Sequence, residues 1–347
     1  MILNYNPLII QMKKQNILAP LSITLWFLLI FNPCSLKAQK VIPHDTSYYV
    51  TYPNTVTARI YLIQKFVPFT ISAPSNNKDL NYKTNSKLDL GIGATYRNLT
   101  LNLSYGFKFL NKDKGQGTTN GLDFQFHLYP HKWAIDLLGT FIKGYYLDPK
   151  DNNGLNLVNK YYLRPDFKRD VIGFSVFRVP NANRFSYRAA LIQNDWQTKS
   201  AGSLLFGGEA YYGIINGDSA LVPSQVSNNF PQKDITKIIF FSIGPGIGYA
   251  YTLVIDKSFF ISASAIGSLD VNFSTEERTN DKHSKVSLLP GGVYKGAIGY
   301  NSSTWSISAN ITGNALYAGS AFSSKEYFLP TGNLRLILAK KIGLKTH

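Results

Sequence analysis

The protein has 347 residues, a formal net charge of +16 at pH 7 and a single cysteine. Aromatic residues make up 14% of the chain and charged residues only 16%, below the roughly 25% of ordinary soluble domains. One cysteine excludes an internal disulfide. The scarcity of charge argues against an ordinary soluble domain.

The first 38 residues have the order of a secretory signal peptide. Lys13 and Lys14 precede the apolar run 17–31, and small residues follow up to Ala38. We therefore predict export with cleavage after Ala38, which removes residues 1–38. A membrane-anchor helix is the alternative, although the run is interrupted by a proline and is short for a span of roughly 20 apolar residues.

Cleavage would leave a mature chain without cysteine. Cys34 does not indicate a lipoprotein, because Asn32 and Pro33 beside it are not the small residues of such a site. The removed segment carries three lysines and no acidic residue, so the formal charge falls from +16 to +13. Export argues against nucleic acid as a partner, and the basic residues form no run. We expect them to face phosphate-bearing lipid head groups.

Residues 39–54 are predicted to be an irregular leader, and residues 55–347 a single domain of alternating strands. The clearest alternation is in residues 87–109, where large apolar residues such as Leu101 occupy one face and small or polar residues the other. This pattern predicts a β-hairpin with its turn at Arg97. Thirteen strands are expected, over residues 56–65, 87–96, 99–109, 122–128, 133–146, 171–179, 185–192, 204–215, 235–254, 259–273, 286–300, 305–315 and 334–342.

The connections between these strands are sorted by length. Short turns of roughly two to four residues are expected near residues 97, 130, 180, 256 and 301, whereas the intervening loops have about 9 to 22 residues. Short periplasmic turns and long extracellular loops are typical of outer-membrane barrels. We therefore predict an all-β fold, a transmembrane antiparallel up-and-down β-barrel.

An odd number of strands conflicts with both termini lying in the periplasm. The conflict lies between residues 185 and 254, because counting strands forward from the first and backward from the last gives opposite directions for the strand at residues 235–254. Either a weak strand lies within residues 216–234, which gives 14 strands, or residues 204–215 do not cross the membrane, which gives 12.

The polar faces of the strands would line the lumen, so any functional site is expected there. Asp123, Gln125 and His127 share one face of a strand, and Asp89 and Asn102 occupy the polar face of residues 87–109. Asp123 and His127 are roughly 13 Å apart on such a strand, too far to touch. The histidines have no metal-ligand spacing. We expect these five residues to line the lumen, with no metal or cofactor.

Two short motifs suggest chemistry but lack its context. Residues 217–221 (GDSAL) are similar to the nucleophile block of GDSL esterases, whose serine needs a downstream Asp-x-x-His; here Asp281 and His283 have the wrong spacing. We expect a turn at residues 217–221. The glycine cluster at residues 243–248 is not followed by a helix, so it is expected to serve strand packing rather than phosphate binding.

Several segments resemble exported Bacteroidota proteins classed as domain of unknown function 4421. They are TARIYLIQKF, LGIGATYRNLTLNLSYGFKFLN, KWAIDLLGTFIKGYYL, RFSYRAALIQNDWQTKSAGSLLFGG and FFSIGPGIGYAYTLVI. The resemblance covers about residues 45–342. It implies an outer-membrane location, and because that family has no assigned activity it implies no site residues.

The leading hypothesis is an outer-membrane barrel that is not an enzyme and acts as a pore, a small-solute conduit or a surface structural protein. Its expected partners are outer-membrane lipid, lipopolysaccharide and the barrel-insertion machinery. One alternative is a barrel-embedded lipid hydrolase or acyltransferase, which would need a histidine and a serine at the lipid-facing rim. Another is a soluble periplasmic β-sandwich that binds a ligand.

Overall fold

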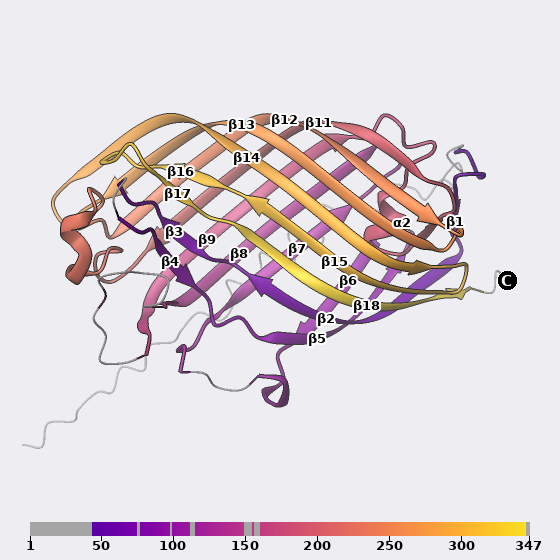
Figure 1. The fold of residues 1–347 in the computed structure, drawn as a ribbon, viewed down its shortest axis with the longest axis horizontal. Coiled ribbons are helices and arrows are strands. Elements are labelled where there is room, and N and C mark those ends of the chain that lie inside the picture. Colours follow the sequence, from indigo (N-terminus) through magenta and orange to yellow (C-terminus); the bar gives the residue numbers. More distant parts are fainter. Residues whose placement is uncertain are drawn as a thin grey trace, which may run out of the picture. The chain divides into compact units, whose positions relative to one another are not determined.

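A computed structural model describes residues 44–74, 77–97, 99–111, 115–148, 155 and 160–344, so the predicted signal peptide and its cleavage site lie outside the described residues. Twelve of the described strands form one antiparallel up-and-down barrel (Figure 1). They are β2 (Thr55–Phe66), β5 (Leu88–Tyr96), β6 (Leu99–Tyr105), β7 (Asn120–Leu128), β8 (Trp133–Leu147), β9 (Tyr162–Arg178), β11 (Ala201–Asn216), β12 (Lys237–Ile255), β13 (Phe259–Glu277), β14 (Lys282–Asn301), β15 (Trp305–Ala315) and β18 (Thr331–Gly343). The predicted fold class is confirmed, with the smaller of the two strand numbers.

The barrel is held together by pairing between strands that follow one another along the chain. The last strand, β18, pairs with the first, β2, from Gly343 opposite Thr55 to Gly332 opposite Phe66. From there the ladder continues through β5 to β6 in one direction, and back through β15 to β8 and β7 in the other. In the described part of the chain, no register joins β6 to β7, which are neighbours at the two ends of this ladder.

The two faces of each strand are inverted relative to a soluble protein. On β12 the outward side chains are large, apolar and exposed: Ile243, Ile247, Tyr249, Tyr251 and Leu253. The alternate residues Ser242, Ala250 and Thr252 point inward and are buried. A continuous exposed apolar surface of this kind is unstable in water and indicates contact with lipid. Among the described residues, no helix is both long and apolar enough to cross a membrane.

One end of the barrel carries the short turns and is called here the turn end. Asp256 and Lys257 both have positive φ, 49° and 64°, as a two-residue type I′ hairpin turn requires. Arg97 likewise has a φ of 53° at the turn between β5 and β6. Four of the five predicted short turns therefore lie where alternation placed them, and the fifth does not.

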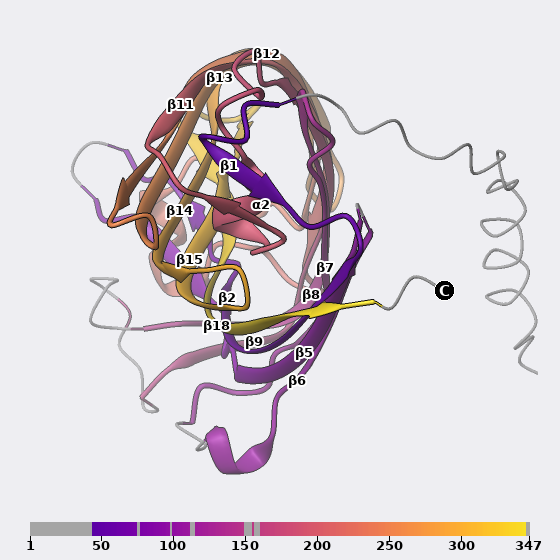
Figure 2. The same cartoon turned by 90° about the vertical axis from the view of Figure 1, so that its right-hand side faces the viewer.

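A plug made of residues 44–54 and 179–200 closes the turn end. It contains β1 (Tyr49–Thr51), α2 (Tyr187–Leu191) and β10 (Asp195–Gln197), and β1 pairs antiparallel with β10. Figure 2 shows β1 and α2 within the ring of barrel strands. Residues 44–54 of the predicted leader are thus part of the folded unit and include the strand β1, while residues 39–43 lie outside the described residues; β2 begins at Thr55.

The plug corrects the predicted strand at residues 185–192. This segment holds the short helix α2 inside the barrel, and the chain returns to the wall only at β11. Both of its faces are buried, including those of the adjacent Ala189 and Ala190, so it has no lipid-facing side. The two explanations offered for the odd strand number are therefore wrong: β11 does pair on both sides, and residues 217–236 contain only the 3₁₀ helix η2 (Ser224–Asn229) among their assigned elements.

A cap made of residues 67–74, 77–83, 217–236 and 316–330 lies at the opposite end. It contains β3 (Phe69–Ile71), β4 (Leu80–Lys83), η2, β16 (Tyr317–Gly319) and β17 (Glu326–Phe328), seen at the left of Figure 1. A further 3₁₀ helix, η1 (Lys108–Leu110), follows β6. The cap has its own apolar core, in which Phe69, Tyr82 and Tyr327 are fully buried. The three loop segments that form the cap thus pack together through this core.

A fully buried arginine ties the cap to the barrel wall. Arg169 of β9 donates to the carbonyls of Pro68, Leu329 and Pro330 at 2.8 to 3.0 Å and to the hydroxyl of Thr331 at 2.6 Å. β9 begins at Tyr162, earlier than the predicted residue 171, so Arg169 lies inside a strand and faces inward.

Candidate functional site

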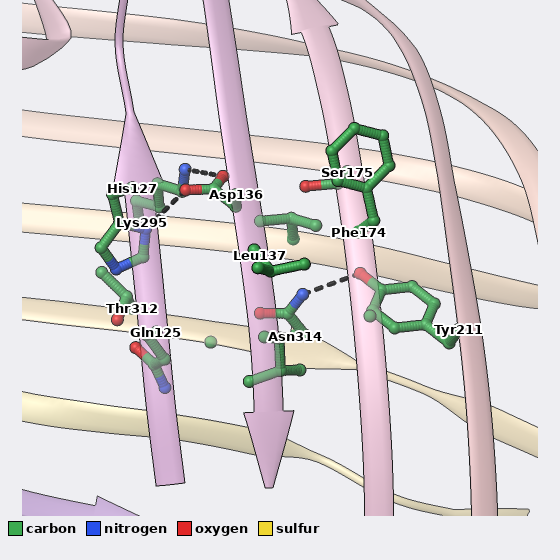
Figure 3. A pocket seen from close by; sticks show the side chains of 14 residues that line it. Gln125, His127, Asp136, Leu137, Phe174, Ser175, Tyr211, Lys295, Thr312 and Asn314 are labelled. Carbon is green, nitrogen blue, oxygen red and sulfur yellow. Dashed lines mark hydrogen bonds and ion pairs between the residues drawn. The ribbon is translucent and has the colours of Figure 1, made fainter. Parts of the chain in front are cut away.

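Between the plug and the cap, four polar residues form a central cluster in the lumen: His127, Tyr129, Asp136 and Lys295. Asp136 on β8 lies directly opposite His127 on β7, and their side chains meet at 2.5 Å between Nδ1 and Oδ1. The Tyr129 hydroxyl donates to the same oxygen at 3.1 Å. Lys295 of β14 forms an ion pair with the other carboxylate oxygen (Figure 3). One carboxylate therefore satisfies three donors from two sides of the barrel.

The central cluster lacks the arrangement of a hydrolase. Ser175 is a candidate nucleophile beside the cluster, but it pairs with Asp136 on the side away from His127 (Figure 3). Nucleophilic catalysis places the base between the serine and the carboxylate, whereas here the carboxylate lies between serine and imidazole. The geometry fits an ion pair that neutralises buried charge.

The space around the central cluster is small. Two cavities of about 20 and 30 Å³ flank Gln125 and His127. Such volumes hold a water molecule or two and no solute. In this structure the middle of the barrel is filled by its own side chains.

The five predicted lumen residues fall into two groups. Gln125 and His127 lie at the central cluster, where Gln125 accepts a hydrogen bond from Asn333 at 2.7 Å. Asn102 accepts a longer one, 3.4 Å, from Arg59. Asp89 and Asp123 lie nearer the cap, and both pair with Lys65, at 3.9 and 3.6 Å. A larger cavity of about 180 Å³ lies beside them.

Three members of the central cluster, Tyr129, Asp136 and Lys295, were not singled out from the sequence. The signal for Asp136 was present, because it alternates with the apolar residues Ile135 and Leu137 and so occupies the inward face. Lys295 had no local signal, since its partner is 159 positions away.

The plug is bonded to the lumen wall along its length. Thr57 donates to Asn194 at 2.9 Å, and Arg59 donates to the carbonyl of Ile192 at 2.9 Å. Tyr187 meets Ser264 at 2.6 Å on the far wall. Within the plug, the hydroxyl of Tyr49 donates to the carbonyl of Ala182, and burial raises its pKa above the usual range. These bonds fix the plug in the barrel mouth.

The GDSAL segment belongs to the cap. Arg164 donates to the carbonyl of Ser219 at 3.2 Å, and the amide of Asp218 donates to Asp166 at 2.9 Å. Asp281 and His283 pair with each other at 2.8 Å on an exposed surface. No group of three or more His, Cys, Asp or Glu among the described residues could hold a metal ion.

No curated protein matches the chain. Solved structures that resemble it include the Escherichia coli outer membrane protease OmpT, at 10% identity and a TM-score of 0.33 over 85% of this chain and 98% of that one. The Pseudomonas putida toluene transporter TodX follows at 7% identity and 0.26, over 85% and 92%. OmpT of Vibrio cholerae has 8% identity and 0.27, over 87% and 100%. At these TM-scores the likenesses carry no argument about activity.

The family comparison bears out the resemblance found in the sequence segments. The family model described as "Domain of unknown function (DUF4421)" matches residues 43–336, which is most of the chain. The chain therefore belongs to the DUF4421 family.

Proposed function

We propose that the protein is an integral outer-membrane barrel that is closed at both ends and serves the cell envelope as a structural surface protein, without enzymatic activity. The observation that carries this proposal is the filled lumen beneath an apolar outer wall. The plug, the central cluster and the cap, all built from described residues, follow one another along the barrel and occupy its interior.

Exposed aromatic residues support insertion in a lipid bilayer. At the turn end, Trp133 and Trp305 begin strands and are exposed. Arg178 and Lys340 lie over their rings at 5.3 and 4.8 Å. Aromatic rings carrying a cation suit the level of the lipid phosphates. This arrangement accounts for part of the positive charge.

A second row of aromatic residues crosses the barrel nearer the cap. Tyr212, Phe241 and Phe273 are neighbours in register on β11, β12 and β13, and all three are exposed. Two aromatic belts with aliphatic residues between them are typical of a membrane barrel. Because the short turns of outer-membrane barrels are periplasmic and their long loops extracellular, the turn end with its plug faces the periplasm and the cap faces the outside. Outer-membrane lipid and lipopolysaccharide are then the surrounding partners, and insertion requires the barrel-insertion machinery.

The closure at both ends argues against a pore or conduit. A solute would have to displace the hydrogen-bonded plug and also the cap with its apolar core. Barrels that conduct have a water-filled interior, whereas the two cavities at the central cluster have room for only a water molecule or two. The serine, histidine and carboxylate geometry described above likewise argues against a lipid hydrolase.

Membrane extraction tests the proposal. The protein should fractionate with outer membranes, resist extraction by salt and alkali, and migrate differently on gels before and after heating. A monomer that stays in solution without detergent would overturn it. Refolded protein should also leave phospholipid and lipopolysaccharide unhydrolysed.

A further inference from the structure

A second polar group lies in the lumen wall, separate from the central cluster. Glu209 on β11 is the register partner of Gly244 on β12. Asp270 on β13 approaches the same glycine from the other side, because a Cβ on Gly244 would lie 2.3 Å from its Oδ1. Both carboxyl groups belong to residues only 3% exposed. Because Gly244 has no side chain, the side chains of Glu209 and Asp270 can approach each other beside it.

Oxygen atoms from three side chains converge beside a second glycine. A Cβ on Gly291 of β14 would lie 2.3 Å from Ser268 Oγ, 2.8 Å from Asp270 Oδ2 and 2.9 Å from Glu209 Oε1. The Ser268 hydroxyl donates to Glu209 Oε1 at 2.6 Å. The other oxygen of Glu209, Oε2, accepts from the hydroxyl of Tyr211 at 3.2 Å. The group therefore gathers side-chain oxygens of β11 and β13 against Gly291 of β14, at a position where only glycine leaves room for them.

This group has no positive charge. Of the ion pairs formed by the described residues, none includes Glu209 or Asp270. Asp270 Oδ1 is fully buried and has no hydrogen-bond partner. Asp136 differs, because Lys295 neutralises it. Buried carboxylates without a counter-charge are costly and are normally paired, metal-bound or protonated.

We propose that Glu209, Asp270 and Ser268 bind a calcium ion. All the available ligands are oxygen atoms, with no imidazole or thiolate among them, which is the donor set of a hard cation. Carboxylates with hydroxyl oxygens in an irregular arrangement suit Ca²⁺, which tolerates variable geometry better than Mg²⁺. Glu209 and Asp270 alone supply too few ligands for a metal ion. The hydroxyl of Ser268, which lies beside both carboxyl groups, supplies a third oxygen ligand. The ion would join strands β11 and β13 inside the barrel, beside Gly291 of β14.

Terbium luminescence provides a direct test, because Tyr211 touches Glu209 and tyrosine sensitises a nearby Tb³⁺ ion. Both ends of the barrel are closed, so the full mature chain is refolded from urea into detergent with Tb³⁺, with Ca²⁺ or with EDTA. We expect sensitised emission that Ca²⁺ abolishes in competition. Refolding with Ca²⁺ at about 100 times its Kd should raise Tm by about 5 °C over the EDTA sample.

Matched variants locate the ion. Glu209→Gln and Asp270→Asn should lose both the emission and the Tm shift, and Asp281→Asn, at an exposed acid, should keep both. Tyr211→Phe should lose emission while keeping the Tm shift. If the amide variants fail to fold, Ser268→Ala should fold and bind Tb³⁺ at least tenfold more weakly. Equal Tm values in Ca²⁺ and EDTA with no wild-type emission would overturn the proposal, because the carboxyls would then share a proton. Emission that survives Glu209→Gln would also overturn it.

Discussion

Replacing Asp136 by asparagine should strongly destabilise the barrel. The carboxylate side chain is 13% exposed and that of Lys295 only 5%, so the substitution leaves a buried ammonium without its counter-charge. Removing one partner of a buried ion pair costs about 3–5 kcal/mol. Asparagine also presents one acceptor oxygen where the carboxylate serves His127, Tyr129 and Lys295. We therefore expect a loss near the upper part of that range.

The assay is equilibrium unfolding in urea of protein refolded into phospholipid vesicles, followed by the fluorescence of the four tryptophans. The matched control is Asp281→Asn, which breaks an exposed pair with His283. Exposed pairs contribute about 0–1 kcal/mol, so the control should unfold nearly like wild type. The double variant Asp136→Leu with Lys295→Met removes both charges and should recover most of the lost stability.

A small effect of Asp136→Asn would refute this reasoning. If the single variant loses less than about 1 kcal/mol, the cluster contributes no more than a surface pair. Water would then reach Lys295, and the lumen could not be closed at this level. A double variant less stable than the single variant would likewise contradict the ionic interpretation.

Three further substitutions probe the cap, a turn and the outer wall. Arg169→Met leaves three cap carbonyls and the Thr331 hydroxyl without their buried donor. Limited proteolysis within residues 316–330 should therefore accelerate, and the free energy of unfolding should fall by about 3 kcal/mol; unchanged proteolysis would count against the anchoring role. Lys257→Gly removes side-chain strain at a φ of 64° and should stabilise by about 1 kcal/mol in urea unfolding, whereas a loss would contradict the type I′ assignment. Ile247→Lys, on a side chain 67% exposed, should cost about 2–4 kcal/mol in vesicles if it faces lipid, with Ile247→Ala as control, and a neutral result would place it in water.

Strand order could be predicted because alternation has a physical cause. A residue such as Leu101 faces lipid and its neighbour Asn102 faces the lumen, so the two faces separate cleanly in the sequence. The type I′ turn at Asp256 was visible for a related reason, since it lies between two long alternating segments. Location of Gln125 and His127 in the lumen followed from the same rule.

The plug was not predictable in this way. Residues 185–192 are apolar, and hydropathy alone does not distinguish burial inside a barrel from contact with lipid. Their helical conformation is stabilised by surrounding contacts, such as Tyr187 with Ser264 on a distant strand. The central cluster depends on Lys295 reaching Asp136 across the lumen, and the cap depends on Arg169 meeting carbonyls more than 100 positions away. Such contacts arise only when the barrel closes.

The claim that the barrel is closed is tested most directly by single-channel conductance in planar lipid bilayers. Refolded wild-type protein should insert and yet give no stable conductance steps. Insertion is checked on protein refolded in the same lipids, whose migration on a gel should change on heating. Replacing residues 184–198 by a short Gly-Ser linker removes α2 and β10 from the plug and leaves the cap intact, so this variant should also stay silent. Regular ohmic steps from the inserted wild-type protein would contradict the account and show an open pore.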